Sequence, residues 1–115
     1  MHTPLSIGNA EHYRWGDNCD GWYLLNRDDL SVIQERVPAG RSEQMHYHHH
    51  SRQFFYVLRG NATLVIGKET VVVKEQEGLE VPPGVPHQLR NDTQADLEFI
   101  VISAPESHGD RVNVD

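Results

Sequence analysis

Cysteine is almost absent from this chain, because Cys19 is the only one among 115 residues. An internal disulfide is therefore excluded, and proteins without disulfides belong by default to reducing compartments. Residues 1–10 are polar and lack the apolar stretch of a secretory signal. From these two observations we expect a cytoplasmic protein.

Positive charge is also scarce. Ten Lys and Arg residues face 17 Asp and Glu residues, the formal net charge is −7, and no run of basic residues occurs. Nucleic acids and anionic membrane surfaces are bound through basic patches, so neither is an expected partner. No apolar stretch approaches the length of a membrane span. The charge balance and the absence of a long apolar stretch therefore argue against both of these partners.

Helical periodicity is missing as well, and short β-branched and aromatic runs broken by Gly, Pro, Asn and Asp recur instead. Many short strands at regular spacing predict an all-β sandwich or barrel. A chain of this length supports one hydrophobic core, so we expect a single domain over residues 1–115 with a core barrel at about 30–103. The predicted strands are 22–26, 30–37, 43–48, 53–59, 62–66, 69–74, 79–81, 87–91 and 97–103.

The two ends of the chain are polar and loop-like, an N-terminal arm over residues 1–21 and a tail over residues 104–115. We expect the tail either to be disordered or to lie along the barrel. Tyr13, Trp15 and Trp22 are large side chains in or beside the arm that need burial. In a small barrel with an unpaired edge, a second subunit would bury them, which predicts a homodimer.

What the chain does have is histidine: eight in all, four of them within positions 46–50. His46 and His48 are two apart on a predicted strand, so they share one face with Cα atoms about 6–7 Å apart. Imidazoles at that spacing can share one metal ion. Another His, His87, follows a corner built from Pro82-Pro83-Gly84, whose restricted backbone makes a stiff mount for a ligand.

The order of these residues resembles the two sequence motifs of the cupin superfamily. Gly40, His46, His48 and Gly60 stand at the spacings of the first motif, G-x5-H-x-H-x4-E-x6-G, with Gln53 in the place of its glutamate. The second motif, P-x-G-x2-H-x3-N, is similar to residues 82–91. It usually begins with a glycine where this chain has Gln76, and we expect Gly78 to take over that turn.

The resemblance implies a double-stranded β-helix (jelly-roll) cupin barrel, a metal ion in its mouth and, frequently, a homodimer. It maps the metal ligands onto His46, His48 and His87, and the fourth ligand position onto Gln53. One divalent transition-metal ion per chain is therefore expected, and Zn, Ni, Fe, Mn, Co and Cu are not distinguished by such a ligand set.

Glutamine in the fourth position has an electrostatic consequence. Three neutral imidazoles and a neutral amide leave the double positive charge of the ion uncompensated, which favours anionic ligands. The chain also lacks the two-histidine, one-carboxylate triad of common non-haem iron oxygenases. Gln53 either ligates the ion directly or hydrogen-bonds near it, and the sequence leaves both roles open.

Each singled-out residue also has an ordinary structural interpretation. His46 and His48 alone could be solvent-facing, but His87 in register favours metal binding. We expect His50 at the rim, His49 facing outward, and Asn91 fixing a turn. We expect His2, His12 and His108 at the surface. The thiol of Cys19 is expected to be a weak nucleophile. The expected core or pocket-wall residues are Phe55, Val57, Leu64, Ile66, Leu89 and Val101.

Three functional hypotheses follow. The first is a metal-binding protein acting on a small anionic or enolisable organic molecule, with dioxygenase-, isomerase- or decarboxylase-like chemistry. The second is a non-catalytic module that binds a sugar or small acid, and the third is a metal-free cupin resembling sugar-nucleotide ketoisomerases. No acid/base pair stands out in the sequence, so catalytic residues stay unassigned and the sequence does not decide whether the protein is an enzyme.

Overall fold

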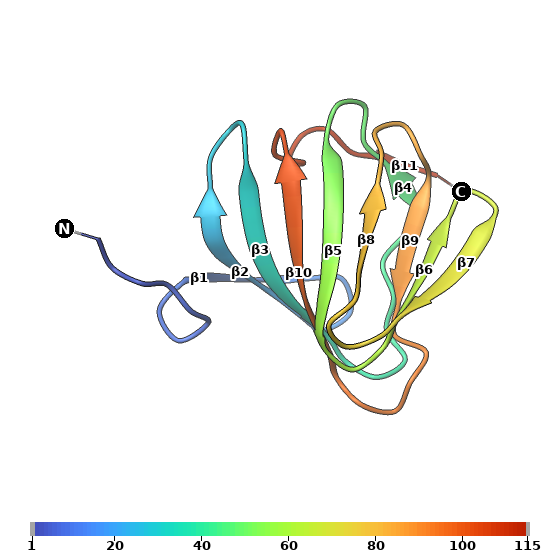
Figure 1. Ribbon diagram of the computed structural model, residues 1–115, viewed down its shortest axis with the longest axis horizontal. Helices are drawn as coiled ribbons and strands as arrows, with labels where there is room; N and C mark the ends of the chain where they lie inside the picture. The colour runs from blue at the N-terminus through green and yellow to red at the C-terminus, as the bar shows by residue number, and fades with distance from the viewer. Residues whose placement is uncertain (1, 115) are drawn as a thin grey trace.

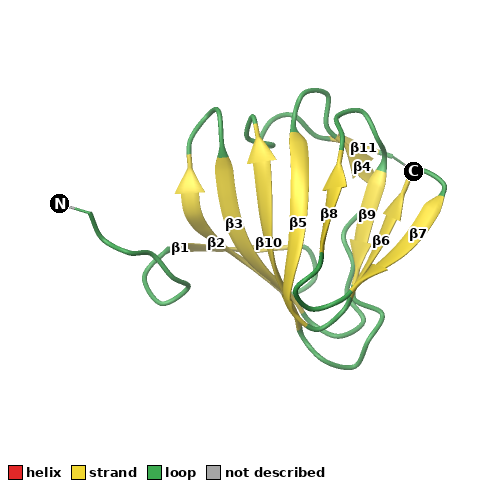
Figure 2. Ribbon diagram, viewed as in Figure 1, coloured by secondary structure: helices red, strands yellow, loops and turns green. Residues whose placement is uncertain are grey.

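The computed structural model describes residues 2–114, which form two antiparallel sheets and no helix (Figures 1 and 2). The larger sheet has six strands in the order β1-β2-β3-β10-β5-β8. None of the described residues belongs to a helix that is long and apolar enough to cross a membrane. The strands of this sheet are β1 (Glu11–Trp15), β2 (Cys19–Asn26), β3 (Ser31–Val37), β5 (Arg52–Arg59), β8 (Gly78–Val81) and β10 (Leu97–Ala104).

The smaller sheet has five strands in the order β11-β4-β9-β6-β7. Its central strand is β9, which pairs with both β6 and β4, and the tight β6–β7 hairpin forms one edge. Figure 1 shows this sheet beside the larger one. Its strands are β4 (His46–Tyr47), β6 (Ala62–Ile66), β7 (Glu69–Val73), β9 (His87–Arg90) and β11 (Val112–Asn113).

The core is built from the alternation of inward and outward side chains along each strand. In β5 the side chains of Gln53, Phe55 and Val57 are buried, whereas Phe54 is 41% exposed. This is the predicted all-β, double-stranded β-helix arrangement. The predicted core is also confirmed, with Ile66 half-buried and packed against the others; its fully buried members are Phe55, Val57, Leu64, Leu89 and Val101.

The expectation that residues 1–21 are loop-like is wrong for their second half. Residues 11–15 form β1, which pairs antiparallel with β2 from Trp15↔Cys19 to Glu11↔Tyr23. Tyr13 and Trp15 pack against the core of their own chain, so their burial does not require a second subunit. The homodimer stays a prediction. Among residues 2–114, the segment before β1 extends away from the sheets (Figure 1).

The polar tail lies along the barrel, the second of the two expected arrangements. Val112 and Asn113 pair with Tyr47 and His46 of β4. The Val114 amide donates to the Met45 carbonyl at 2.9 Å, which continues the pairing. The tail therefore returns to the segment that carries two of the predicted metal ligands.

The turn before β8 corrects the expectation for Gly78. Gln76 itself adopts a left-handed backbone with φ of 66°, in the place where the cupin motif has glycine. Its amide nitrogen donates to the Val57 carbonyl at 2.8 Å, and Tyr56 donates from its hydroxyl to the Gln76 side-chain oxygen at 3.0 Å. These bonds hold the non-glycine residue in this conformation, and Gly78 is part of β8 instead.

Asn91 fixes a turn, as expected. It is fully buried, and its side-chain nitrogen donates to the carbonyls of Val37 and Ala95 at 2.9 and 2.8 Å. Its side-chain oxygen accepts hydrogen bonds from Thr93. Asn91 thus joins the end of β3 to the loop between β9 and β10, away from any ligand role.

Candidate metal centre

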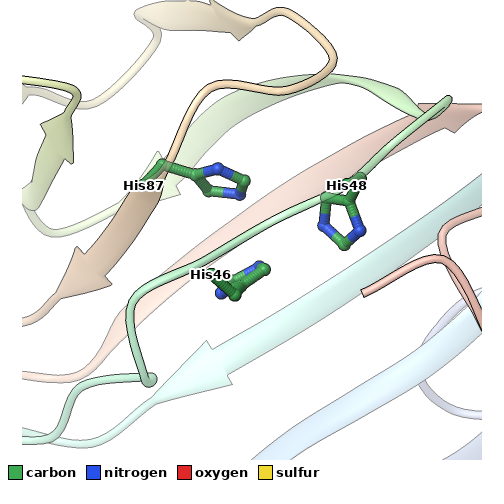
Figure 3. Close-up of side chains that lie close together, drawn as sticks. All are labelled: His46, His48 and His87. Atoms are coloured by element: carbon green, nitrogen blue, oxygen red, sulfur yellow. The ribbon is translucent and has the colours of Figure 1, made fainter. Parts of the chain in front are cut away.

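The three predicted histidine ligands converge in one buried cluster (Figure 3). His46 of β4 lies directly opposite His87 of β9 in the antiparallel pair, with ring centroids 4.4 Å apart. The His48 ring lies 5.0 Å from that of His46 and 5.6 Å from that of His87. One ring nitrogen from each residue falls within 4.8 Å of the others, a spacing that fits three ligands of a single ion.

The other ring nitrogen of each histidine is held by a backbone carbonyl. A carbonyl oxygen only accepts hydrogen bonds, so each Nδ1 carries the proton and each Nε2 keeps its lone pair. Such carbonyl partners are what metal-ligating histidines use to fix tautomer and ring orientation. The bonds join Nδ1 of His46 to Gln44 at 2.7 Å, of His48 to Asp110 at 2.7 Å, and of His87 to Val85 at 2.9 Å.

Buried polar atoms without partners show that the cluster fits a cation. Nε2 of His48, Nε2 of His87 and Oε1 of Gln53 are buried and make no hydrogen bond to any residue between 2 and 114. An unpaired buried acceptor costs free energy unless something binds it. A metal ion accepts lone pairs from all three atoms, so the donor set suits the ion that the cupin resemblance implies.

Burial keeps the three imidazoles neutral. It lowers the pKa of His46 to about 3, although the Gln44 carbonyl works in the opposite direction. Burial likewise lowers the pKa values of His48 and His87, against the raising effect of their carbonyl partners. Neutral imidazole is the form that binds metals, so the cluster is ready to ligate at neutral pH.

The position of Gln53 is compatible with both roles that the sequence left open. Its side-chain nitrogen donates to the Ser103 hydroxyl at 3.0 Å, on the neighbouring strand β10. In this arrangement Oε1, the better metal ligand, makes no hydrogen bond to a described residue. Gln53 therefore bonds to the barrel wall while presenting an oxygen; its ligation of the ion stays a prediction.

Two segments hold the backbone around His48. The Asp110 carboxylate accepts hydrogen bonds from three consecutive amides, those of His49, His50 and Ser51, each at 2.9 Å. From the other side, the Gly84 amide of the predicted corner donates to the His48 carbonyl at 2.7 Å. Both His49 and His50 are exposed, as expected. The tail and the proline corner thus hold the backbone of His48 from two sides.

The histidine cluster opens into a cavity of about 280 Å³. Its walls include residues that sequence reasoning did not assign to the site, namely Tyr13, Glu35, Glu43 and Arg111. The signal for Glu35 was present, because it alternates with Ile33 and Val37 on the core-facing side of β3, where a carboxylate is unusual. Tyr13 and Arg111 were placed in arm and tail, and no local pattern predicted their approach.

Two other expectations concern residues outside the cluster. His108 is exposed, as expected, but it also lines the cavity and lies 3.4 Å from the Tyr23 hydroxyl. Cys19 is buried at the start of β2 rather than in a loop. Burial, more than the carboxylates of Glu35 and its acidic neighbours, raises the pKa of its thiol to about 11, so the thiol is a weak nucleophile.

Proteins of known sequence resemble this chain over most of its length. An uncharacterized protein of Methanocaldococcus jannaschii is 30% identical over 81 residues, which are 70% of this chain and 65% of that protein. A mannose-1-phosphate guanylyltransferase of Salmonella montevideo is 32% identical over 97 residues, 84% of this chain. That alignment spans only 20% of the longer enzyme.

Solved structures share the fold of this chain. An RmlC-like cupin from Shewanella frigidimarina superposes with a TM-score of 0.83 at 19% identity, over 95% of this chain and 96% of that one. The sequence model of the cupin domain matches residues 33–103, which include the histidine cluster and Gln53. The chain therefore belongs to the cupin family.

Proposed function

We propose that the protein binds one divalent transition-metal ion through His46, His48 and His87, with Gln53 as fourth ligand, and receives a small anionic or enolisable organic molecule beside it. The observation that supports this most directly is the set of carbonyl-anchored imidazoles, one ring nitrogen of each lying within 4.8 Å of the others. Three imidazoles and an amide are ligands that Zn, Ni, Fe, Mn, Co or Cu accept.

The charges of the cavity favour an anionic group on the ligand. All four proposed metal ligands are neutral, so an ion in the cluster retains its double positive charge. Arg111 lines the same cavity and forms no ion pair with any described residue. A bound divalent ion would act as a Lewis acid that polarises a carbonyl oxygen. A carboxylate or keto acid could therefore interact with both the divalent ion and the Arg111 guanidinium.

A second candidate is a sugar phosphate. The alignment with the Salmonella mannose-1-phosphate guanylyltransferase covers 84% of this chain and supports a sugar-derived ligand in the cavity. A sugar phosphate is itself anionic, so it suits Arg111 and the cation equally well. In this alternative the protein binds its ligand without turnover.

Metal analysis and calorimetry test the proposal. Untagged protein is analysed for metals as purified, then stripped and titrated with Zn²⁺; we expect one ion per chain. The loaded protein is titrated with oxalate, 2-oxobutanoate and mannose 1-phosphate, and oxygen uptake is followed on a panel of keto acids and diketones. His50→Ala, which removes an exposed neighbouring imidazole, is the matched control. Failure to bind zinc stoichiometrically would reject the proposed function.

A further inference from the structure

A second polar cluster lines the cavity apart from the histidines. We call Tyr13, Glu35 and Glu43 the carboxyl cluster; all three are half-buried and border the cavity that His46 and His48 also line. The Tyr13 hydroxyl donates to Oε2 of Glu35 at 2.9 Å. This is an acid/base pair of the kind that the sequence alone did not reveal.

The pair depends on a glycine between its two strands. Tyr13 of β1 lies opposite Gly21 of β2, and Gly21 lies opposite Glu35 of β3. A Cβ atom on Gly21 would come within 2.2 Å of the Tyr13 ring. Only glycine lets the phenol cross the middle strand and reach the carboxylate two strands away. Three successive strands thus cooperate to place one hydrogen bond in the cavity wall.

The two carboxyl groups differ in how they are held. Glu43 accepts a hydrogen bond from the Leu89 amide at 3.0 Å, so its Oε2 is used by the backbone. Glu35 instead accepts at its Oε2 from a side-chain hydroxyl, and in both groups Oε1 stays available to a ligand. We take Glu35 as the residue that exchanges a proton with a molecule in the cavity, because a phenol orients it and its pKa lies nearer neutrality.

The surroundings adjust Glu35 to neutral pH. Burial raises its pKa to about 7, whereas the Tyr13 hydrogen bond and the charge of Arg111 act to lower it. Burial and the Glu35 charge together raise the pKa of the Tyr13 phenol, which stays protonated as the donor. Burial and Glu35 also raise the pKa of Glu43 to about 8. A group with a pKa near the working pH is suited to general acid/base catalysis.

We propose that Glu35, oriented by Tyr13, is the residue that transfers a proton to and from an enolisable carbonyl compound bound beside the histidine cluster. The inference rests on the proposed function and narrows it to proton-transfer chemistry. The C–H bond next to the carbonyl breaks, its proton moves to Oε1 of Glu35, and its electron pair moves to the carbonyl oxygen. Return of the proton to the same or another carbon gives exchange or isomerisation, and no oxidant is consumed.

Solvent exchange measures this step. Zinc-loaded protein is mixed with 2-oxobutanoate in D₂O, and loss of the C3 proton signal is followed by NMR. We expect the wild type to accelerate exchange, Glu35→Gln to lose it by at least about 100-fold, and Tyr13→Phe by about 10-fold, since general acid/base groups contribute 10²–10⁴. Glu69→Gln, which neutralises an exposed carboxylate on β7, should match the wild type.

Proton counting on ligand binding gives a readout that needs no turnover. Oxalate mimics the enolate formed after proton transfer, so its binding should bring a proton onto Glu35 at about pH 8. Calorimetry in buffers of different ionisation enthalpy should show uptake of close to one proton by the wild type and by Glu69→Gln. In Glu35→Gln the uptake should disappear, while the zinc affinity stays within about two-fold.

The outcomes separate the two proposals. If the wild type binds zinc and oxalate but Glu35→Gln exchanges protons as fast and takes up the same number of protons, the role of Glu35 is rejected and the proposed function stands. The role is equally rejected if the wild type binds 2-oxobutanoate without accelerating exchange. If the wild type binds no zinc, the proposed function fails and the role of Glu35 falls with it.

Discussion

In the histidine cluster burial lowers the pKa values of three imidazoles, whereas in the carboxyl cluster burial raises those of Glu35 and Glu43. The physical cause is the same, because a low-dielectric wall disfavours whichever form is charged. Both clusters are therefore driven toward neutrality in one cavity. The two clusters differ in what they offer a ligand. The histidine cluster offers lone pairs to a cation, whereas the carboxyl cluster offers a group that can gain or lose a proton.

The largest effect is expected from removing a ligand of the histidine cluster. His46→Ala or His87→Ala leaves two imidazoles, and we expect stoichiometric zinc binding to be lost, with affinity at least about 100-fold weaker. Elemental analysis and calorimetry measure it. Glu43→Gln, in the carboxyl cluster, should retain one ion per chain. A histidine variant that also retains one ion per chain would show that the ligand set is wrong.

Protons should compete with the metal only at acidic pH. The imidazole pKa values are lowered from about 6.5, to about 3 for His46. Zinc affinity should therefore change little between about pH 8 and pH 6.5. Below that range it should fall by up to about ten-fold per pH unit for each imidazole that becomes protonated. Calorimetric titration across pH checks this. Constant affinity down to about pH 3 would mean that histidines do not bind the ion.

Replacing Asp110 tests whether the tail supports the histidine cluster without itself ligating the ion. Asp110→Ala removes the acceptor of three amides next to His48, and loss of such outer support costs about 10–100-fold in metal affinity. Zinc titration against Asp29→Ala, an exposed turn residue, measures the loss. An unchanged affinity would show that the tail does not position His48.

Replacing Gln53 by glutamate tests whether the side chain at position 53 lies beside the ion. Gln53→Glu adds a negative charge beside the ion, so zinc should bind more tightly and oxalate several-fold more weakly. The attraction removed at about 4 Å is on the order of 1 kcal/mol in water and about 4 kcal/mol at an effective dielectric of 20. Calorimetry with both ligands measures the two effects. Unchanged affinities would place Gln53 away from the ion.

The carboxyl cluster should reveal its raised pKa values in the pH dependence of unfolding of the metal-free protein. Glu35 has a pKa of about 7 in the folded protein and about 4.5 when unfolded, so its stabilising contribution is full below about pH 4.5 and is lost as pH rises through 7. Glu35→Gln lacks this loss and should gain on the order of 3 kcal/mol relative to wild type over that range. Urea unfolding of both proteins, with Glu69→Gln as control, measures it. A pH-independent difference would contradict the raised pKa.

The sequence predicted the histidine cluster and missed the carboxyl cluster for a physical reason. His46, His48 and the corner before His87 each lie within a short stretch of sequence, so their pattern can be recognised without knowing which strands pair. The Tyr13–Glu35 bond joins residues 22 positions apart through Gly21, a glycine that looks like any other in sequence. The strand containing Tyr13 also escaped prediction, because its residues are mostly polar and exposed. Contacts that depend on pairing between distant strands are set by tertiary structure.

The bond between His48 and the Asp110 carbonyl would couple docking of the tail to binding of a metal ion by the histidine cluster. Whatever free energy a docked tail adds to metal binding, a bound metal must return to tail docking, because coupling between two binding events is reciprocal. Ligand occupancy would thus be visible far along the chain as slower hydrogen exchange of the amides paired between β4 and β11. By the same reciprocity, removal of the residues after Ala104 would weaken the binding of a metal ion by the histidine cluster.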